Sequence, residues 1–490
     1  MNAPPHTNVQ QLIQTGQRHH AAGNLAAAEQ CYLQARQLQP GNPQISYLLG
    51  MIALAHNNAE AAVELFGAAL QSNPKEPAIR VQLATALQKA GRDEEALALA
   101  RSTASADSAG ADEHYYLALT LCQQRKHEEA LIPAERSLQL RPDGIDTLLL
   151  LSALYPALGR WDRAMQIAEQ AVRAHPGLSE TQWNHAIVCL SHGDMTPGWE
   201  SFERRPHLKV PAGATLWHRQ DLTGKSLLLY CEGGFGDAIQ FVRYVPQLQG
   251  RAKKILLACP AELLELFKDI PIDQLLPHGQ TLPQCDYVCP LQSLPFNFQT
   301  TLETIPRDVP YLRAAERKAA TWATTIGSGS DRKVGLAWAG SDAGDKQRSR
   351  SLRLFAPLAG VTGVKFFSLQ KGPESWQAAA PPLGMQIQDF MPRVRDFADL
   401  AGIIEHLDLV ISIDTSVAHL AGAMGKTVWT LIPFVPDFRW MLDRTDTPWY
   451  PTMRLYRQKA ANDWSAPIAQ VTADLTDLQQ QARKGSVSKP

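Results

Sequence analysis

Residues 232–241 read Glu-Gly-Gly-Phe-Gly-Asp-Ala-Ile-Gln-Phe. They follow an apolar run at 226–230, which predicts a buried strand, and they open a stretch at 238–248 with apolar residues at helical spacing. The sequence therefore predicts a strand, a glycine-rich turn and a helix. Gly234 and Gly236 allow unusual backbone angles and a close approach of a ligand to the backbone.

Asp237 stands in the first turn of this predicted helix. Two interpretations are open at this point. A carboxylate there can cap the helix, or it can act as a general base at the mouth of a cleft.

An internal period runs through the first ~200 residues, as repeat proteins show. Four prolines are spaced by 34, 68 and 34 residues: Pro40, Pro74, Pro142 and Pro176. Twelve residues before each proline, and before Ser108 at the skipped step, stands an alanine: Ala28, Ala62, Ala96, Ala130 and Ala164. Residues suited to a turn stand 17 before the same positions: Gly23, Asn57, Gly91, Arg125 and Gly159.

This pattern resembles the tetratricopeptide repeat, with five units over about residues 8–176 and a less regular sixth unit from Glu180 to Phe202. Such repeats bury their cores by stacking and form a concave face. We expect a protein or peptide partner in that groove. Candidate groove residues, on the first helix of each unit, are Tyr47, Arg80, Tyr115 and Asn184.

From about Leu216 short apolar runs alternate with helical stretches. The runs predict buried parallel strands at 226–230, 254–258, 286–289, 334–338, 364–369, 409–413 and 427–432. The fold prediction is α + α/β: a helical solenoid at 1–205, then two doubly wound lobes at 206–328 and 329–490. Ligands bind at the carboxyl ends of such sheets, so a cleft between the lobes is expected.

Residues 414–423, Asp-Thr-Ser-Val-Ala-His-Leu-Ala-Gly-Ala, follow one of these strands and open a helix. Asp414, Thr415 and Ser416 would stand at the helix start, where hydroxyls and backbone N–H groups favour a phosphate. The alternative is an ordinary helix cap, with His419 packed in the core.

Residues 338–351 form a polar loop after another strand. Lys346, Arg348 and Arg350 could neutralise a diphosphate there, or they could belong to a solvated basic loop.

Several classes of function fit the composition poorly. The net charge of −1 gives no broad footprint for nucleic acid, and no apolar run approaches the length of a membrane span. Seven scattered cysteines suit a reduced, cytoplasmic protein without zinc or another metal. A dinucleotide fingerprint, a P-loop and a nucleophile elbow are absent from the sequence. A diphosphate ligand facing a carboxylate remains, which describes group transfer from a nucleotide-activated donor.

Three stretches, at 234–241, 334–340 and 414–423, resemble bacterial tetratricopeptide-repeat glycosyltransferases. Arg439-Trp440 and Pro-Trp-Tyr-Pro-Thr-Met at 448–453 are also typical of that group. The catalytic region of that family is similar to the ADP-heptose:lipopolysaccharide heptosyltransferases. The resemblance implies a GT-B fold, two Rossmann-like lobes, an inverting mechanism and a nucleotide-diphosphate sugar, usually without a metal or other cofactor.

The resemblance also implies roles. Asp237 matches the base that deprotonates the acceptor, and Thr415, Ser416 and His419 match the diphosphate site. Lys346, or in competition Arg350, corresponds to a phosphate-neutralising cation.

Other residues belong to the predicted cleft by their expected position. Gln240 is expected on the acceptor side, and Trp338 and Gln370 at strand ends near the nucleotide base. Core packing is the alternative for Trp338. In the leading hypothesis, closure of the lobes assembles the base and the phosphate site.

The leading hypothesis is sugar transfer to a protein recruited by the repeats, with flagellin as the acceptor that the resemblance suggests. The alternatives are transfer to a lipopolysaccharide or other glycan precursor, and a non-catalytic repeat scaffold with a degenerate transferase half. Oligomerisation is left open.

Overall fold

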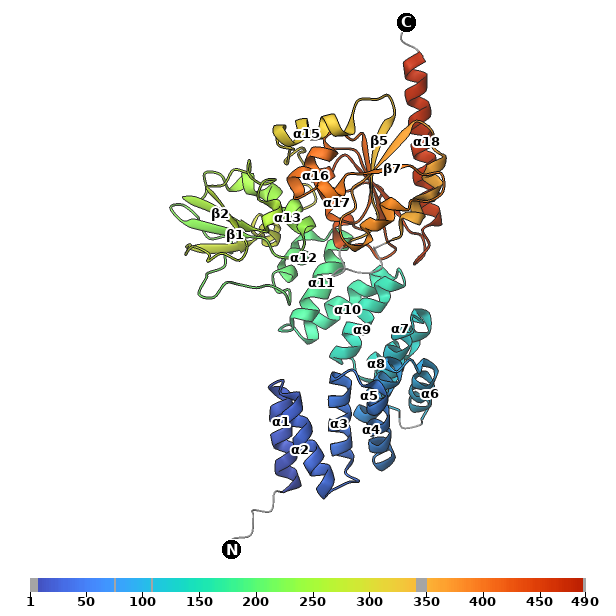
Figure 1. Cartoon of the computed structure of the whole chain (residues 1–490). Coiled ribbons are helices and arrows are strands. Elements are labelled where there is room, and N and C mark those ends of the chain that lie inside the picture. The colour runs from blue at the N-terminus through green and yellow to red at the C-terminus, as the bar shows by residue number, and fades with distance from the viewer. Residues whose placement is uncertain (1–7, 75, 107–108, 341–349, 488–490) are drawn as a thin grey trace. The chain divides into compact units, whose positions relative to one another are not determined.

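The structure is a computed structural model, and it describes residues 8–74, 76–106, 109–340 and 350–487. The chain forms two compact units, Met1–His175 and Pro176–Pro490, which are considered in turn (Figure 1).

The first unit is a series of antiparallel helix pairs. Its helices are α1 (Val9–Ala21), α2 (Leu25–Leu38), α3 (Pro43–Ala55), α4 (Ala59–Ser72), α5 (Pro77–Lys89), α6 (Asp93–Ala104), α7 (Ala111–Gln123), α8 (His127–Leu140), α9 (Ile145–Ala157) and α10 (Trp161–Ala174). The turn within each pair contains a residue with positive φ, at the positions that the period predicts: Gly23, Asn57, Gly91, Arg125 and Gly159. The periodic prolines each follow two residues after the end of a second helix, where they prevent its continuation.

The periodic alanines are fully buried, because a small side chain lets paired helices approach closely. In the first two units a glycine on the first helix meets an aromatic ring on the second. A Cβ added at Gly50 would lie 2.7 Å from the Phe66 ring, and one at Gly16 would clash with Tyr32. The predicted tetratricopeptide-repeat solenoid is confirmed.

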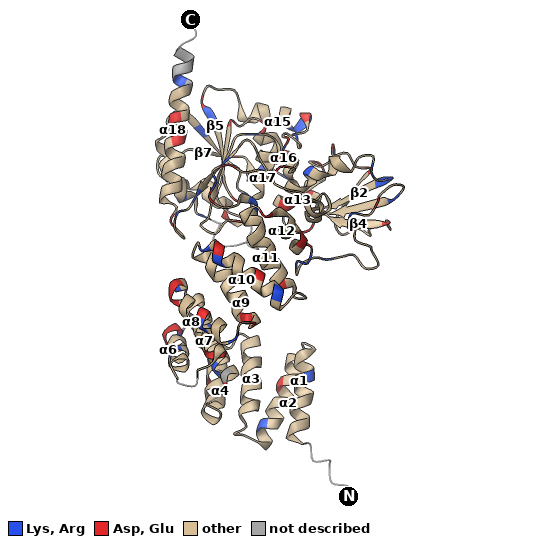
Figure 2. Ribbon diagram, turned by 180° about the vertical axis from the view of Figure 1, so that it is seen from behind, with Lys and Arg blue, Asp and Glu red and all other residues tan. Residues whose placement is uncertain are grey.

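Ion pairs join neighbouring repeats, and Figure 2 marks the acidic and basic residues on the helices. Arg92 lies 3.4 Å from Glu60, and Arg160 lies 3.0 Å from Glu128, in the same register within their repeats. All four side chains are well exposed, so each pair contributes at most about 1 kcal/mol. The buried small residues, and not these pairs, hold the stack together.

The second unit contains two parallel sheets, which confirms the α/β prediction. The four-stranded sheet has the order β3 (Gln274–Pro277), β2 (Lys254–Cys259), β1 (Ser226–Tyr230), β4 (Tyr287–Pro290). The six-stranded sheet has the order β10 (Met453–Arg457), β9 (Val428–Ile432), β8 (Leu409–Ile413), β5 (Arg332–Ala337), β6 (Val364–Ser368), β7 (Ile387–Asp389).

Seven of these strands match predicted apolar runs, and three were not predicted: β3, β7 and β10. Each of the three lies at the edge of its sheet. These three strands keep part of their surface exposed, so their sequences lack a continuous apolar run, whereas β4, also at an edge, is mostly buried.

Helices and 3-10 helices cover the sheets and lead away from the strand ends. They are α13 (Phe235–Phe241), η1 (Val242–Leu248), η2 (Ala261–Leu263), η3 (Leu291–Ser293), α14 (Leu294–Asn297), α15 (Glu316–Ile326), η4 (Leu352–Gly360), η5 (Pro373–Ala379), η6 (Met391–Arg393), α16 (Phe397–Ile404), α17 (Ser416–Ala423), η7 (Phe438–Trp440) and α18 (Ser465–Val487). The predicted helix at 238–248 is α-helical only in its first part, because Pro246 lies in the second.

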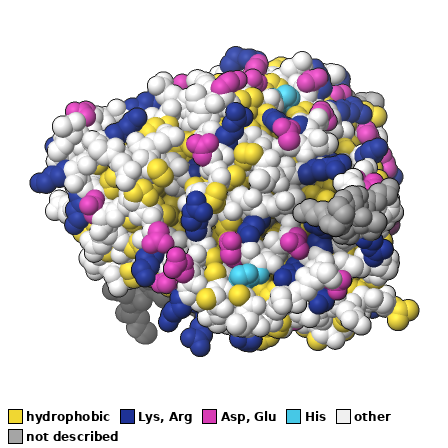
Figure 3. Space-filling model, turned by 90° about the horizontal axis from the view of Figure 1, so that it is seen from above, with side chains coloured by type: hydrophobic (Ala, Val, Ile, Leu, Met, Phe, Trp, Pro, Cys, Tyr) yellow, Lys and Arg dark blue, Asp and Glu magenta, His cyan; other side chains and the backbone are white. Residues whose placement is uncertain are grey.

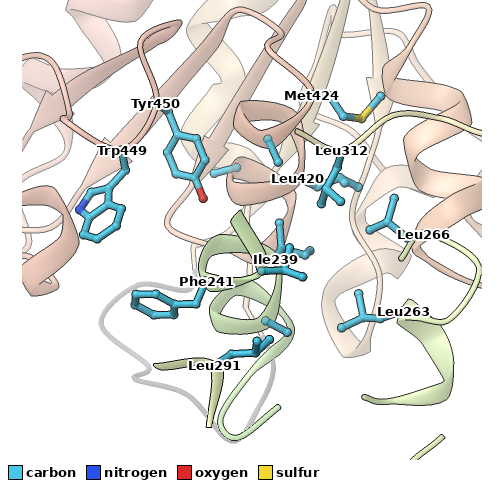
Figure 4. Close-up of a cluster of buried hydrophobic side chains, with 14 of the residues drawn as sticks. Ile239, Phe241, Leu263, Leu266, Leu291, Leu312, Leu420, Met424, Trp449 and Tyr450 are labelled. Carbon is cyan, nitrogen blue, oxygen red and sulfur yellow. The ribbon is translucent and has the colours of Figure 1, made fainter. Parts of the chain in front are cut away.

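The second unit has two halves, one around each sheet, and one hydrophobic cluster contains residues of both halves. Figure 4 shows Ile239 and Phe241 of α13 beside Leu420 of α17 and the rings of Trp449 and Tyr450. The two sheets therefore share a core.

The last repeat-like helix pair, α11 (Ser179–His192) and α12 (Met195–Phe202), belongs to this second unit. Trp199 of α12 is buried, with ring centroids 6.3 Å from Phe241, 5.9 Å from Phe438 and 6.5 Å from Trp449. The predicted boundary at 205 followed the repeat register, whereas the compact unit begins at 176 because α12 packs into the α/β core.

On the face drawn in Figure 3, basic and acidic side chains are interspersed among apolar ones. None of the described helices combines the length and the apolar character that a bilayer span requires.

We expect Trp199→Ala to destabilise the second unit by roughly 3–5 kcal/mol, because it removes an indole from the junction of α12 with both sheets. Thermal and denaturant unfolding of the full chain measure this. Trp376→Ala is the matched control, since that side chain is 65% exposed and should change stability by about 0.5 kcal/mol or less. Equal effects of the two substitutions would contradict this packing role.

Candidate functional site

A cavity of about 910 Å³ lies where the carboxyl ends of the two sheets face each other. Its walls are the segments that follow β1, β2, β5, β6, β7, β8 and β9. This is the place where open parallel sheets bind ligands, and the volume is in the range of small-molecule sites.

The glycine turn after β1 forms one wall of the cavity. Gly233 has a φ of +78°, and a Cβ there would lie 2.6 Å from Asp237 Oδ2, so a larger side chain does not fit. The Gly234 N–H donates to Asp237 Oδ2 over 2.8 Å. Asp237 therefore caps α13 and also lines the cavity. Its position fits both a helix cap and a carboxylate that faces a ligand.

Gly236 lies at the contact between α13 and α17. A Cβ added there would lie 2.9 Å from Cδ2 of His419, which also lines the cavity. The glycine lets α13 and α17 pack at close range and bring the two walls together.

Arg439 is the link between the walls. Its guanidinium is buried and donates to Asp237 Oδ1, to Asp437 Oδ1 over 2.8 Å, and to Gln240 Oε1 over 2.6 Å. Burial alone would lower the pKa of Arg439, but the carboxylates of Asp437 and Asp237 outweigh burial and raise the pKa above its usual value. Arg439 therefore stays charged in the cavity wall.

Gln240 was expected to line the acceptor side of the cleft. The structure places its side chain in the interior, away from the cavity lining, where it orients Arg439. Gln240 lies about one turn after Asp237, on the same face of α13. Both side chains therefore reach the Arg439 guanidinium, and Gln240 contacts it from the buried side.

The start of α17 forms the opposite wall. Asp414, Thr415 and Ser416 all line the cavity, with Thr415 and Ser416 half-buried. The Thr415 hydroxyl caps the helix by accepting from Val417 N–H over 3.3 Å. Positive helix-end charge and hydroxyl donors at this wall suit an anionic group of a ligand.

His419 is buried one turn further along α17. Its Nδ1 lies 2.8 Å from the Tyr450 hydroxyl, and its ring stacks on Trp440 with centroids 5.3 Å apart. The ring edge still reaches the cavity, so both core packing and contact with a ligand fit its position.

Two sequence candidates in the second half, Trp338 and Arg350, lie outside the cavity lining. Trp338 is fully buried in the core of the six-stranded sheet, which supports the packing alternative. Arg350 lies outside the lining and places its guanidinium over the Trp464 ring at 5.0 Å. Lys346 and Arg348 lie outside the described residues.

Gln370 lines the cavity, but its side chain is engaged within its own half. Its Oε1 accepts from the N–H groups of Trp338 and Ala339, over 2.9 and 2.8 Å. Its Nε2 donates to the carbonyls of Ala339 and Lys371, over 2.9 and 2.8 Å. Gln370 thus fastens the ends of β5 and β6 together, and a direct contact with a nucleotide base is not what its geometry favours.

The structure adds residues that sequence reasoning did not assign to the site. Asp437 and Arg439 line the cavity, although they lie about 200 residues from Asp237 along the chain. Phe235 and Phe397 also line it, with ring centroids 4.8 Å apart across the two halves. The Asp-x-Arg spacing at 437–439 signals a local cap, but nothing in it indicates the distant partner.

Within the described ranges, no group of three or more His, Cys, Asp or Glu side chains is arranged to hold a metal ion.

Comparison with known proteins supports the assignment of the repeats. Residues 14–77 and 53–122 match two descriptions of the tetratricopeptide repeat. Protein FlbA of Caulobacter vibrioides is 25% identical over 495 residues, which span 93% of this chain and 82% of FlbA.

Solved structures of repeat proteins are also similar to part of the chain. TTC0263, a thermophilic TPR protein of Thermus thermophilus, is 20% identical over 36% of this chain and 97% of its own, with a TM-score of 0.32. YrrB, a TPR protein with an unusual peptide-binding site, is 16% identical over 36% of this chain and 90% of its own, with a TM-score of 0.27.

We expect Gly236→Ala to destabilise the second unit by roughly 1–3 kcal/mol, because the new methyl group would press on His419 at the contact between α13 and α17. Thermal unfolding of the full chain tests this. Gly234→Ala is the control, since a Cβ there would meet its nearest neighbour, Asp237 Oδ2, at 3.7 Å. If Gly236→Ala is as stable as the wild type, the close approach of the two walls is not required.

Proposed function

We propose that this chain is an inverting glycosyltransferase that moves a sugar from a nucleotide-diphosphate donor to a protein acceptor. In this proposal the two sheets are the Rossmann-like lobes of a GT-B fold. The observation that carries it is a single cavity lined by Asp237, from the segment that follows β1 of the four-stranded sheet, and by Thr415 and Ser416, from the segment that follows β8 of the six-stranded sheet.

The chemistry needs both walls. The acceptor hydroxyl oxygen forms a bond to the anomeric carbon from one face, and the bond from that carbon to the diphosphate oxygen breaks on the other face. The diphosphate leaves with the electron pair, and the hydroxyl proton passes to a carboxylate beside Arg439. Asp237 is the residue that the sequence prediction names for this step.

The leaving diphosphate would be stabilised by the start of α17 and by Lys371, which also lines the cavity. Lys371 donates to the Val394 carbonyl, and both residues line the cavity. The proposal includes no resident metal, and we expect turnover to persist in the presence of a chelator.

A protein acceptor is favoured by the repeats, since tetratricopeptide repeats commonly bind peptides or proteins. A second observation supports it within the α/β unit. Helix α12 packs on Phe438, the neighbour of both Asp437 and Arg439, so a repeat-like helix pair backs the wall that carries the carboxylates. A flagellin is one acceptor of this kind.

The test is release of nucleoside diphosphate by the full chain from a panel of nucleotide sugars, with and without candidate acceptor proteins. We expect Asp237→Asn to lower turnover by about 100-fold or more, because the change weakens both proton transfer and the placement of Arg439.

Asp308→Asn, at an exposed site, is the matched control and should keep wild-type turnover. Full turnover in Asp237→Asn would contradict the assigned site. Failure of the wild-type chain with every donor would contradict the transferase proposal and leave the repeat scaffold as the function.

A further inference from the structure

Arg205 is a buried arginine just after the end of α12, outside the cavity lining. Its Nε donates to Glu232 Oε1 over 2.5 Å, and its Nη2 donates to the Ser293 hydroxyl over 3.0 Å. Its Nη1 donates to the Phe202 carbonyl and to Glu203 Oε1, over 3.0 and 3.2 Å. All three nitrogens of the guanidinium are therefore engaged, and one side chain links the last repeat-like helix pair to the residue that precedes the glycine turn.

The charge of Arg205 needs partners, because a guanidinium in the interior is costly unless acceptors surround it. Two carboxylates approach it, and both side chains are mostly buried, with 8% of Glu203 and 14% of Glu232 exposed. Burial raises the pKa of Glu203, although Arg205 opposes this shift. Glu232, which makes the shorter contact, is therefore the main ionic partner of Arg205.

Glu232 is also held at its backbone, since its carbonyl accepts from Gln292 Nε2 over 3.3 Å. The next residue, Gly233, has a φ of +78°, and a Cβ there would lie 2.6 Å from Asp237 Oδ2 and 2.7 Å from Gln292 Nε2. The Gly234 N–H then donates to Asp237 Oδ2. The turn is thus closely packed between Glu232 and Asp237, so a shift of Glu232 would be passed on to the Asp237 carboxylate.

The place of Asp237 matters because a general base works only within hydrogen-bond reach of the hydroxyl that it deprotonates. A misplacement of about 1 Å, even from a change far from the chemistry, can cost about 100-fold in rate. Asp237 has two supports: Arg439 donates to one carboxylate oxygen, and the glycine turn donates to the other. Through Glu232, Arg205 holds the start of the second support.

We propose that Arg205 is a positioning residue that sets the place of Asp237 through Glu232 and the glycine turn. This inference rests on the proposed transferase function. The last repeat-like helix pair then does more than cover the α/β core. The Arg205 guanidinium lies 4.8 Å above the ring of Phe202, which α12 presents, so this helix carries part of the support of the proposed base.

The experiment compares Arg205→Lys with the wild type in the full chain, using the donor on which the wild-type chain is active. Lysine keeps the positive charge, but its single ammonium group does not reproduce the planar fork that reaches Glu232 and Ser293 together. We expect kcat to fall by about 10-fold or more. The KM of the donor and the Kd of the released nucleoside diphosphate should change by less than about twofold, because other segments form the phosphate site. Arg204→Lys is the matched control at the neighbouring, exposed position and should keep the wild-type kcat.

A second comparison leaves Arg205 unchanged and decides the matter if Arg205→Lys does not fold. The amide oxygen of glutamine can still accept from Arg205 Nε, so Glu232→Gln should keep kcat within about threefold of the wild type. Glu232→Ala removes that acceptor and should lower kcat by about 10-fold or more.

A double substitution gives a readout that a merely structural role would not produce. In the Asp237→Asn background, Glu232→Ala should lower the residual turnover by less than about twofold, because its effect passes through the Asp237 carboxylate.

Wild-type kcat in Arg205→Lys or in Glu232→Ala would overturn the inference. So would a loss of nucleoside diphosphate binding in parallel with kcat, or equal effects of Glu232→Ala with and without Asp237→Asn, since either marks a general effect on the fold. These outcomes require an active wild type, so they are distinct from failure of the proposed function, in which the wild type itself shows no turnover.

Discussion

The buried guanidinium of Arg439 is the interaction on which the arrangement of the candidate site depends. It joins Asp237, which follows the inner strand β1 of the four-stranded sheet, to Asp437, which follows β9 of the six-stranded sheet. A charged group in an interior position is costly unless it is paired and hydrogen-bonded, and Gln240 supplies the remaining partner for its Nε. The pairing therefore fixes the geometry of two carboxylates in the wall of one cavity.

Apolar packing supports this polar centre from outside. Trp199 of α12, Phe241 of α13 and Trp449 meet at the junction of the two sheets, and Gly236 allows α13 to rest against His419. A second buried arginine, Arg243, ties the segment after α13 to the other half through the Trp449 carbonyl over 2.6 Å. The cavity walls are therefore joined by a shared core in this structure.

Local patterns in the sequence were sufficient for much of the fold. The repeat register follows from turn residues and small residues at fixed spacing, because each repeat packs only on its neighbours. The glycine turn and the start of α17 were recognisable because a strand, a turn and a helix succeed one another within a few residues. Edge strands such as β7 escaped prediction because their residues are partly exposed.

The candidate site was less predictable because its central contacts join distant parts of the chain. The pairing of Arg439 with Asp237 spans 202 positions, and no local spacing encodes it. Gln240 was expected on the acceptor side of the cleft, and Trp338 was expected at a strand end, with core packing as the alternative, but both side chains are fully buried. The inward positions have functions of their own, since Gln240 orients Arg439 and Trp338 fills the core of the large sheet.

The most direct test of the central claim is a crystal structure of the full chain soaked with nucleoside diphosphates and nucleotide sugars. The account predicts density in the cavity between the strand ends, with phosphate oxygens at the N–H groups and hydroxyls of Thr415 and Ser416. The sugar, or the space for it, should face the carboxylates at Arg439. Phosphates bound elsewhere, or a cavity that stays empty with every nucleotide at saturating concentration, would contradict it.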